Sequence, residues 1–277
     1  MADENVIEVS TWAQFEAALT GEEDGKVILL IADIDFNDEH PDGMSTTIVP
    51  KRYSVYGNGN GQRHKIKNMH YTGDSYFIKA TSSKHLAFYS VDIENVLTEP
   101  ADNTSYLFDY CDFNDCDLSM ILSGSIKLSY AIGRVGFDNC GIRINANYSE
   151  DASSWQILEL AATDCNLTLE GRYRQLTLRM TRSYIGGSIR YKENNGNTDR
   201  ITFGNSVNSI ITLGVDAQGT VHKLATGVTT CAIDTTVINV DNIYPTGMIQ
   251  CTTEQIKSPS YLASQGFPIV PVVVGGE

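Results

Sequence analysis

The stretch FNDCDL at residues 113–118 decides the fold, because altered copies of it recur along the chain. The closest copies read FDNCGI and ATDCNL, and the looser ones keep only the kind of residue at each position. The seven copies occupy residues 66–71, 88–93, 137–142, 162–167, 180–185, 203–208 and 228–233. An internal repeat of this length indicates a solenoid, in which each repeat packs on its neighbours.

Each position of the repeat favours one kind of side chain. The first position is always apolar, and the third is Asn or Asp in five copies. Asn and Asp tolerate a left-handed backbone and bond their own main chain, so they predict a tight bend. Strict alternation follows the bend, as in CNLTL at residues 165–169, and predicts a strand with one buried face. The fourth position is small or apolar: Met69, Val91, Cys116, Cys140, Cys165, Ser183, Ser206 and Cys231.

The fourth positions follow each other at intervals of 18 to 25 residues, about 23 on average. Helix-turn-helix repeats need roughly 33 to 47 residues, whereas a coil of three short parallel strands fits this length. The sequence therefore predicts an all-β fold, a single parallel β-helix of at least eight coils. The pattern resembles the right-handed parallel β-helix of pectate-lyase-like proteins over residues 27–250. Such folds host unrelated activities, so the resemblance implies a fold rather than a function.

Residues 1–26 are predicted to form a short strand and a helix that caps the first coil. Residues 6–9 alternate as a strand, and Thr11 with Gln14 three residues later is a capping box. The helix ends at Gly21, and KVILLI at residues 26–31 then reads as a fully buried strand. A lid is expected because an open solenoid end exposes apolar interior and unpaired strand edges. One face of the helix carries the apolar residues Trp12, Phe15, Ala18 and Leu19.

Residues 251–277 are predicted to form a C-terminal cap. Ser258 and Pro259 begin a short helix that closes at Gly266. An apolar arm follows, and its two prolines exclude a central strand. The arm either plugs the last coil or pairs with a neighbouring subunit by strand addition. In the second case the partner-binding residues are Phe267, Ile269, Val270, Val272, Val273 and Val274.

Four of the six cysteines, Cys116, Cys140, Cys165 and Cys231, share the fourth repeat position and therefore predict an interior column. Stacked side chains about 4.8 Å apart are too far for the Cβ separation of a disulfide, near 3.8 Å. We expect small, buried, reduced side chains with a structural role. No metal and no cofactor are predicted, since no ligand group stands at a metal-binding spacing.

The charge is concentrated near the N-terminus. Residues 1–45 hold twelve acidic side chains and one basic, a net −11 of the chain's −14. This region is either a solvated face or a surface for a basic partner. The excess of acidic over basic side chains disfavours nucleic-acid binding, which depends on Lys and Arg. Residues 1–5 have neither the basic region nor the apolar region of a secretory signal peptide. No apolar run approaches the roughly 18 residues of a membrane-spanning segment. We therefore expect no signal peptide, no membrane contact, and assembly in a reducing cytoplasm.

The densest acidic group is Asp109, Asp112, Asp115 and Asp117. Glycoside hydrolysis needs two carboxylates about 5 Å or roughly 6.5–9.5 Å apart, so these are the candidates if the protein is an enzyme. The alternative is a solvated turn edge, and the full set of polygalacturonase motifs is not found. A basic stripe offers an ion-pair ladder or a site for an acidic partner: Arg172, Arg174, Arg179, Arg182 and Arg190.

The ending TTEQIKSPSYLASQGFPI at residues 252–269 resembles the ends of β-helix proteins from bacteriophages and gut bacteria. With the missing signal and missing catalytic motifs, it favours a non-catalytic component of a bacteriophage particle. Such a component is a capsid decoration, a head fibre, or a tail-fibre or receptor-binding element. Its expected partners are other virion proteins, copies of itself or a host-surface glycan. The alternative function is a depolymerase, a lyase or hydrolase acting on surface polysaccharide.

Overall fold

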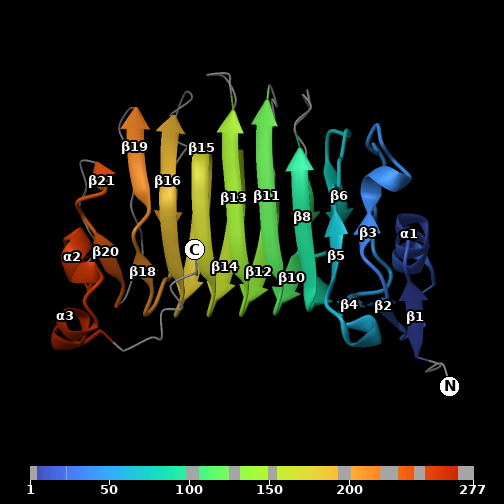
Figure 1. Cartoon of the computed structure of the whole chain (residues 1–277), viewed down its shortest axis with the longest axis horizontal. Coiled ribbons are helices and arrows are strands. Elements are labelled where there is room, and N and C mark those ends of the chain that lie inside the picture. Colours follow the sequence, from blue (N-terminus) through green and yellow to red (C-terminus); the bar gives the residue numbers. More distant parts are fainter. Residues whose placement is uncertain are drawn as a thin grey trace.

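The computed structural model describes residues 5–22, 24–97, 106–124, 132–148, 155–192, 201–218, 230–239 and 247–267. In this part of the chain every pairing between the strands of the β-helix is parallel, and the strands stack coil upon coil along the long axis (Figure 1). The all-β parallel β-helix is thereby confirmed. None of the helices in these ranges is long and apolar enough to cross a membrane.

Two rows of strands carry most of the coils. The β7 row contains β1 (Val6–Val9), β2 (Val27–Leu30), β4 (Ser54–Tyr56), β7 (Leu86–Tyr89), β10 (Cys111–Asn114), β12 (Ile132–Asp138), β14 (Trp155–Thr163), the second half of β15 (Asn166–Thr181) and β17 (Ile201–Phe203). The β8 row contains β3 (Ile34–Asp35), β5 (His64–Lys67), β8 (Val91–Leu97), β11 (Asp117–Gly124), β13 (Gly141–Tyr148), the first half of β15, β16 (Tyr184–Lys192), β18 (Ile210–Ile211), β19 (Gly214–Gln218), β20 (Ala232–Asp234), β21 (Ile238–Asn239) and β22 (Ile249–Cys251). Strands β6 (Tyr76–Lys79) and β9 (Tyr106–Asp109) pair separately.

A single left-handed residue turns the chain from the β7 row into the β8 row. Asp115, Asn139 and Asp164 have this conformation, as the Asn and Asp of the repeat predict. Among the described residues, the left-handed ones directly before the fourth-position column have φ between 46° and 60°: Ser90, Asp115, Asn139, Asp164, Arg182, Asn208 and Thr230. In the corner after β17, Asn205 is left-handed as well. The bend is therefore a property of the coil, and residues other than Asn and Asp adopt it where the stacking requires it.

Two copies of the repeat were placed in the wrong register by the sequence pattern. His64, not Met69, lies opposite Val91, because the segment at residues 57–63 lengthens that coil before β5. Ser209, not Ser206, continues the column above Ser183, since Tyr184 pairs with Ile210. Extra residues at the corner shift a coil without disturbing its alternation, so the pattern alone cannot detect the shift.

Phenylalanines form the centre of the core. Phe88 and Phe113 stack at 4.9 Å between ring centroids, and Phe113 and Phe137 stack at 4.8 Å. All three are buried, and each occupies the first position of its repeat. In β2, Ile28 and Leu30 are buried but Val27 and Leu29 are half-buried, so the prediction of a fully buried strand was wrong.

Both ends of the solenoid are covered by helices (Figure 1). Helix α1 (Trp12–Thr20) buries the predicted apolar face, and the Thr11 side chain accepts a hydrogen bond from the Gln14 backbone. At the other end lie α2 (Thr253–Ile256) and α3 (Pro259–Ser264), which Ser258 caps. Helix α2 was not predicted, although Thr252 and Gln255 form the capping box that signals it. Residues 97–105 and 192–199 are polar and contain Pro or Gly, which predicts projecting loops, and after their first residue both stretches lie outside the described residues.

Arg52 ties the N-terminal lid to the coils. Its guanidinium donates to the Ala18 carbonyl at 2.6 Å and to both Asp24 oxygens at 2.9 Å. These hydrogen bonds hold the pKa of Asp24 well below its ordinary value. A carboxyl with a lowered folded-state pKa stabilises the fold above its ordinary pKa, near 3.9, and loses that contribution as the pH falls.

Replacement Arg52→Met is therefore expected to lower the melting temperature at pH 7, because the lid loses its ion pair and the Ala18 carbonyl loses a donor. The difference from the wild type should narrow as the pH falls below about 4, where Asp24 becomes protonated in the unfolded chain. Thermal unfolding at pH 7 and pH 3 measures both differences. Equal differences at the two pH values would contradict the assigned role of Asp24.

Candidate functional site

The predicted acidic group is divided between two environments. Asp109 has no exposed side-chain surface, and it accepts hydrogen bonds from the Arg134 guanidinium at 2.9 and 2.7 Å. The Arg134 backbone donates to the same carboxylate at 3.1 Å. In return, the Asp109 carboxylate raises the pKa of Arg134. Asp109 is thus a buried structural anion.

The other carboxylates contact the coils on either side. Asp112 pairs with His85 at 2.9 Å, and Asp117 accepts a hydrogen bond from the Gly141 backbone at 3.2 Å. Glycine leaves room for three of the four aspartates, since an added Cβ would come within 2.8 Å of a carboxylate oxygen: Gly133 beside Asp109, Gly136 beside Asp112 and Gly141 beside Asp117. The coil above the acidic group is shaped to receive it.

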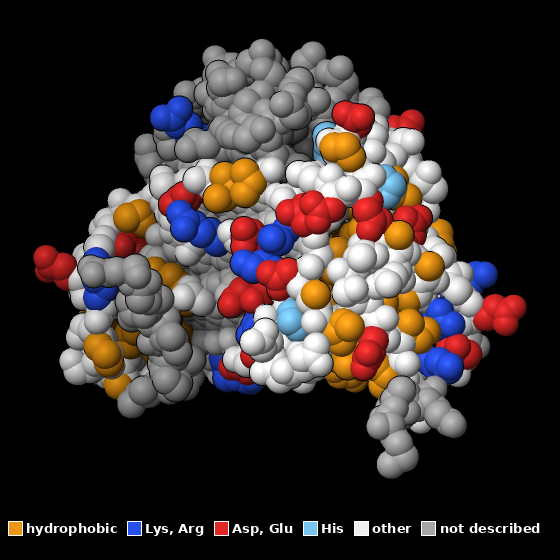
Figure 2. Space-filling view, turned by 45° about the vertical axis from the view of Figure 1, so that its right-hand side comes forward, with side chains coloured by type: hydrophobic (Ala, Val, Ile, Leu, Met, Phe, Trp, Pro, Cys, Tyr) orange, Lys and Arg blue, Asp and Glu red, His pale blue; other side chains and the backbone are white. Residues whose placement is uncertain are grey.

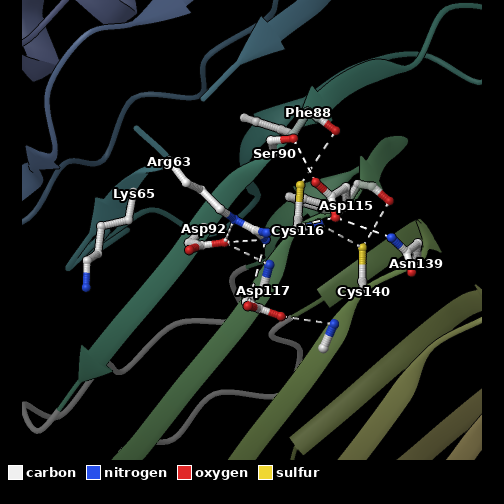
Figure 3. Close-up of polar contacts among 12 residues, drawn as sticks. Arg63, Lys65, Phe88, Ser90, Asp92, Asp115, Cys116, Asp117, Asn139 and Cys140 are labelled. Carbon is white, nitrogen blue, oxygen red and sulfur yellow. Dashed lines mark hydrogen bonds and ion pairs between the residues drawn. The ribbon is translucent and has the colours of Figure 1, made fainter. Parts of the chain in front are cut away.

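Arg63 gathers three carboxylates from the next two coils, and we name these four residues the Arg63 cluster. Its guanidinium donates to Asp92 at 2.7 Å, and it lies 3.9 Å from Asp115 and 3.8 Å from Asp117. Figure 3 shows the Arg63 side chain reaching across the corner toward these aspartates. Partial burial lowers the pKa of Arg63, but the hydrogen bond to Asp92 and the negative charges of Asp92, Asp117 and Asp115 together outweigh it and raise the pKa overall.

Fixed donors of the chain itself occupy the cluster's carboxylates. Asp115 accepts from Ser90 Oγ at 2.9 Å and from Asn139 Nδ2 at 3.2 Å. Asp92 accepts from the Asp117 backbone at 3.0 Å, which ties two coils together. These carboxylates hold neighbouring coils in place, although Asp115 and Asp117 remain 57% and 68% exposed. The arrangement suits a rigid polar binding surface.

The fourth-position column also has a structural function. The Cys116 backbone donates to Cys140 Sγ at 3.3 Å, and the Cys165 backbone donates to Ser183 Oγ at 3.1 Å. Cys140 Sγ in turn donates to the Asp138 carbonyl at 3.1 Å. Each such side chain accepts the buried N–H of the coil before it, and a thiol or a hydroxyl fits. All six cysteines, including Cys231, are buried and free, and burial raises the pKa of Cys231 to about 11.

Replacement Cys140→Ala is expected to destabilise the protein by about 1–3 kcal/mol, because the Cys116 N–H is left buried without an acceptor. Cys140→Ser should cost less, since Ser183 already makes this contact two coils later. Urea unfolding of the two variants checks the order. A Ser variant no more stable than the Ala variant would show that the thiol acts only through its volume.

The basic stripe is in part an ion-pair ladder. Arg179 lies 3.0 Å from Glu159, and Arg182 donates to Asp164 at 2.8 Å. The Arg182 hydrogen bond lowers the pKa of Asp164. Arg190 is exposed, and the side chains of Arg172 and Arg174 lie outside the described residues. The stripe is thus neutralised at the two positions where the structure shows its partners.

The arm is described only at its first residue. Phe267 is 4% exposed and packs with Ile256 and Leu262, so in this conformation it faces its own chain rather than a partner. The five other predicted partner-binding residues lie outside the described residues: Ile269, Val270, Val272, Val273 and Val274. Among the described residues, no group of three His, Cys, Asp or Glu is placed to hold a metal ion.

A family described as a pectate lyase-like adhesive domain matches residues 6–118. The match covers less than half of the chain, from the first strand through the coil of the acidic group, and it includes the whole Arg63 cluster. No curated protein matches the chain. The family agrees with the parallel β-helix and indicates a surface-binding or polysaccharide-related function.

Proposed function

We propose that the protein is a non-catalytic binding component that presents the outer side of its β-helix to a surface polysaccharide. The observation that carries the proposal is the Arg63 cluster, whose side chains are held between coils by contacts of 2.6 to 3.9 Å. A surface fixed before binding loses little side-chain entropy when a ligand is bound. The similarity of residues 6–118 to an adhesive domain supports the same function.

We further propose that this component belongs to a bacteriophage particle, as a capsid decoration, head fibre, or tail-fibre or receptor-binding element. The support is the resemblance of the sequence ending and the apolar residues that follow Phe267. Phe267 anchors that segment to the C-terminal end of the coils, where it packs against α2 and α3. Other virion proteins or copies of the chain are the proposed partners of the arm.

The binding proposal is tested with intact polysaccharides and with cells that display them. We expect the protein to be retained while the polysaccharide keeps its chain length and gains no new ends. Shortening of the polymer would favour the depolymerase instead, provided that Asp115→Asn or Asp117→Asn abolishes it. Asp164→Asn is the matched control, since Asp164 is an exposed, ion-paired turn residue outside the cluster.

The arm is tested by light scattering of the full chain beside a chain that ends at Phe267, which keeps the buried anchor. An assembly element predicts an oligomer for the full chain and a stable monomer for the shortened one. Two monomers, with an earlier melting temperature for the shortened chain, would mean that the arm only plugs the last coil.

A further inference from the structure

We infer that the outer face of the β8 row binds a neutral polysaccharide through an amphipathic strip, defined as Val96, Ser119, Ile121, Arg143 and Asn145. The inference rests on the proposed function and names the ligand class and the residues that recognise it. The strip runs over β8, β11 and β13, beyond the Arg63 cluster at the starts of β8 and β11.

Two apolar side chains of the strip are exposed to solvent. Of the large hydrophobic residues that the structure describes, three are exposed: Val49 at 56%, Val96 at 45% and Ile121 at 41%. Val96 and Ile121 lie directly opposite each other on neighbouring strands, so they form one continuous apolar surface. Figure 2 shows hydrophobic side chains beside interspersed acidic and basic ones on the molecular surface.

Polar side chains border this apolar pair. Asn145 lies opposite Ile121, and its Nδ2 donates to Glu170 at 3.1 Å while its buried Oδ1 has no hydrogen-bond partner. Arg143 lies opposite Ser119 and is exposed, and the structure pairs it with no carboxylate in the ranges it describes. A sugar ring has an apolar C–H face and a rim of hydroxyls, and such a strip can contact both.

The charges around the strip favour the binding of a neutral polysaccharide over an acidic one. The neighbouring cations are already paired, Arg63 with Asp92 and Lys65 with Glu94 at 2.8 Å. The exposed carboxylates of Glu94 and Asp117 lie on the same strands as the strip, so a polymer of acidic sugars would meet like charge there. Arg143 then serves as a hydrogen-bond donor to hydroxyls, a task that another uncharged donor can partly take over.

The test measures binding to immobilised dextran, mannan and galactan, with polygalacturonate as the acidic polymer. Wild-type protein should bind at least one neutral polymer, with an affinity that is unchanged between low and high salt. The double variant Val96→Thr/Ile121→Thr should bind about tenfold more weakly, because it loses apolar contact but keeps β-branched side chains. Val49→Thr removes a comparably exposed apolar group elsewhere and should bind like the wild type. Arg143→Gln should retain part of the affinity.

Three results would overturn the inference. Salt-sensitive binding to polygalacturonate alone would show an acidic ligand. Neutral binding that the double variant leaves unchanged would move the site off the strip, while the proposed surface-binding function would stand. Retention on no polymer and on no cell surface would overturn both the inference and the proposed function.

Discussion

Replacement Gly187→Ala is expected to destabilise the protein by about 3 kcal/mol, the combined result of backbone strain and overpacking. Gly187 has φ of +101°, a conformation that side-chain-bearing residues rarely adopt. An alanine Cβ would lie 2.1 Å from the Leu169 carbonyl oxygen and 2.9 Å from the Leu169 nitrogen. Both atoms are backbone of the preceding coil, so the clash can be relieved only by separating the coils.

The matched control is Gly204→Ala, where an added Cβ meets no atom within 4 Å. Gly171→Ala should behave like Gly187→Ala, since its φ is +98° and the Ala146 carbonyl oxygen would lie 2.1 Å away. Melting temperature and urea midpoint compare the three variants. If Gly187→Ala matched Gly204→Ala, the close approach of the coils at β15 and β16 would be wrong.

Replacement Arg134→Met is expected to cost about 3 kcal/mol, the lower end for a broken buried ion pair because Arg134 itself is 39% exposed. The methionine leaves the Asp109 carboxylate buried without its counter-charge. It also removes the cation–π contact of Arg134 with the Tyr110 ring, 4.1 Å from its centroid. Urea unfolding measures the loss.

Two further variants test whether the loss of stability comes from the buried charge of Asp109. Arg182→Met breaks an exposed pair with Asp164 and should cost much less stability than Arg134→Met, because water screens exposed charges. The double variant Arg134→Met/Asp109→Leu removes both charges, and it should recover much of the lost stability because no buried charge remains. A loss for Arg134→Met no larger than that for Arg182→Met would show that Asp109 is hydrated in solution.

The Arg63 cluster was missed because the register of its coil was wrong. With Met69 in the column, Arg63 belongs to no corner and has no neighbour in the repeat. With His64 opposite Val91, Arg63 falls beside Ser90, and Asp115 stands at the same corner one coil further on. The signal was present in the alternation of HKIK at residues 64–67, which matches VDIE at residues 91–94 better than the chosen copy does.

The environments of the four aspartates could not be predicted from the sequence, for a different reason. They stand within nine residues, and the repeat places Asp115 at the turn, where its φ of 53° confirms it. Nothing in the repeat distinguishes Asp109, which is fully buried, from Asp117, which is exposed. Their environments depend on Arg134 and Gly141 in the following coil, and that coil is 24 to 25 residues away.

The sequence by itself determined the parallel β-helix, its left-handed corners, the interior column and the helical lids. These features repeat with a fixed period or depend on a few adjacent residues, so local preference and alternation are sufficient to specify them. Only the tertiary structure decided which charges meet, which carboxylate is buried and which apolar residues stay exposed. Those outcomes depend on contacts between coils, and a single extra residue at a corner changes which side chains face each other.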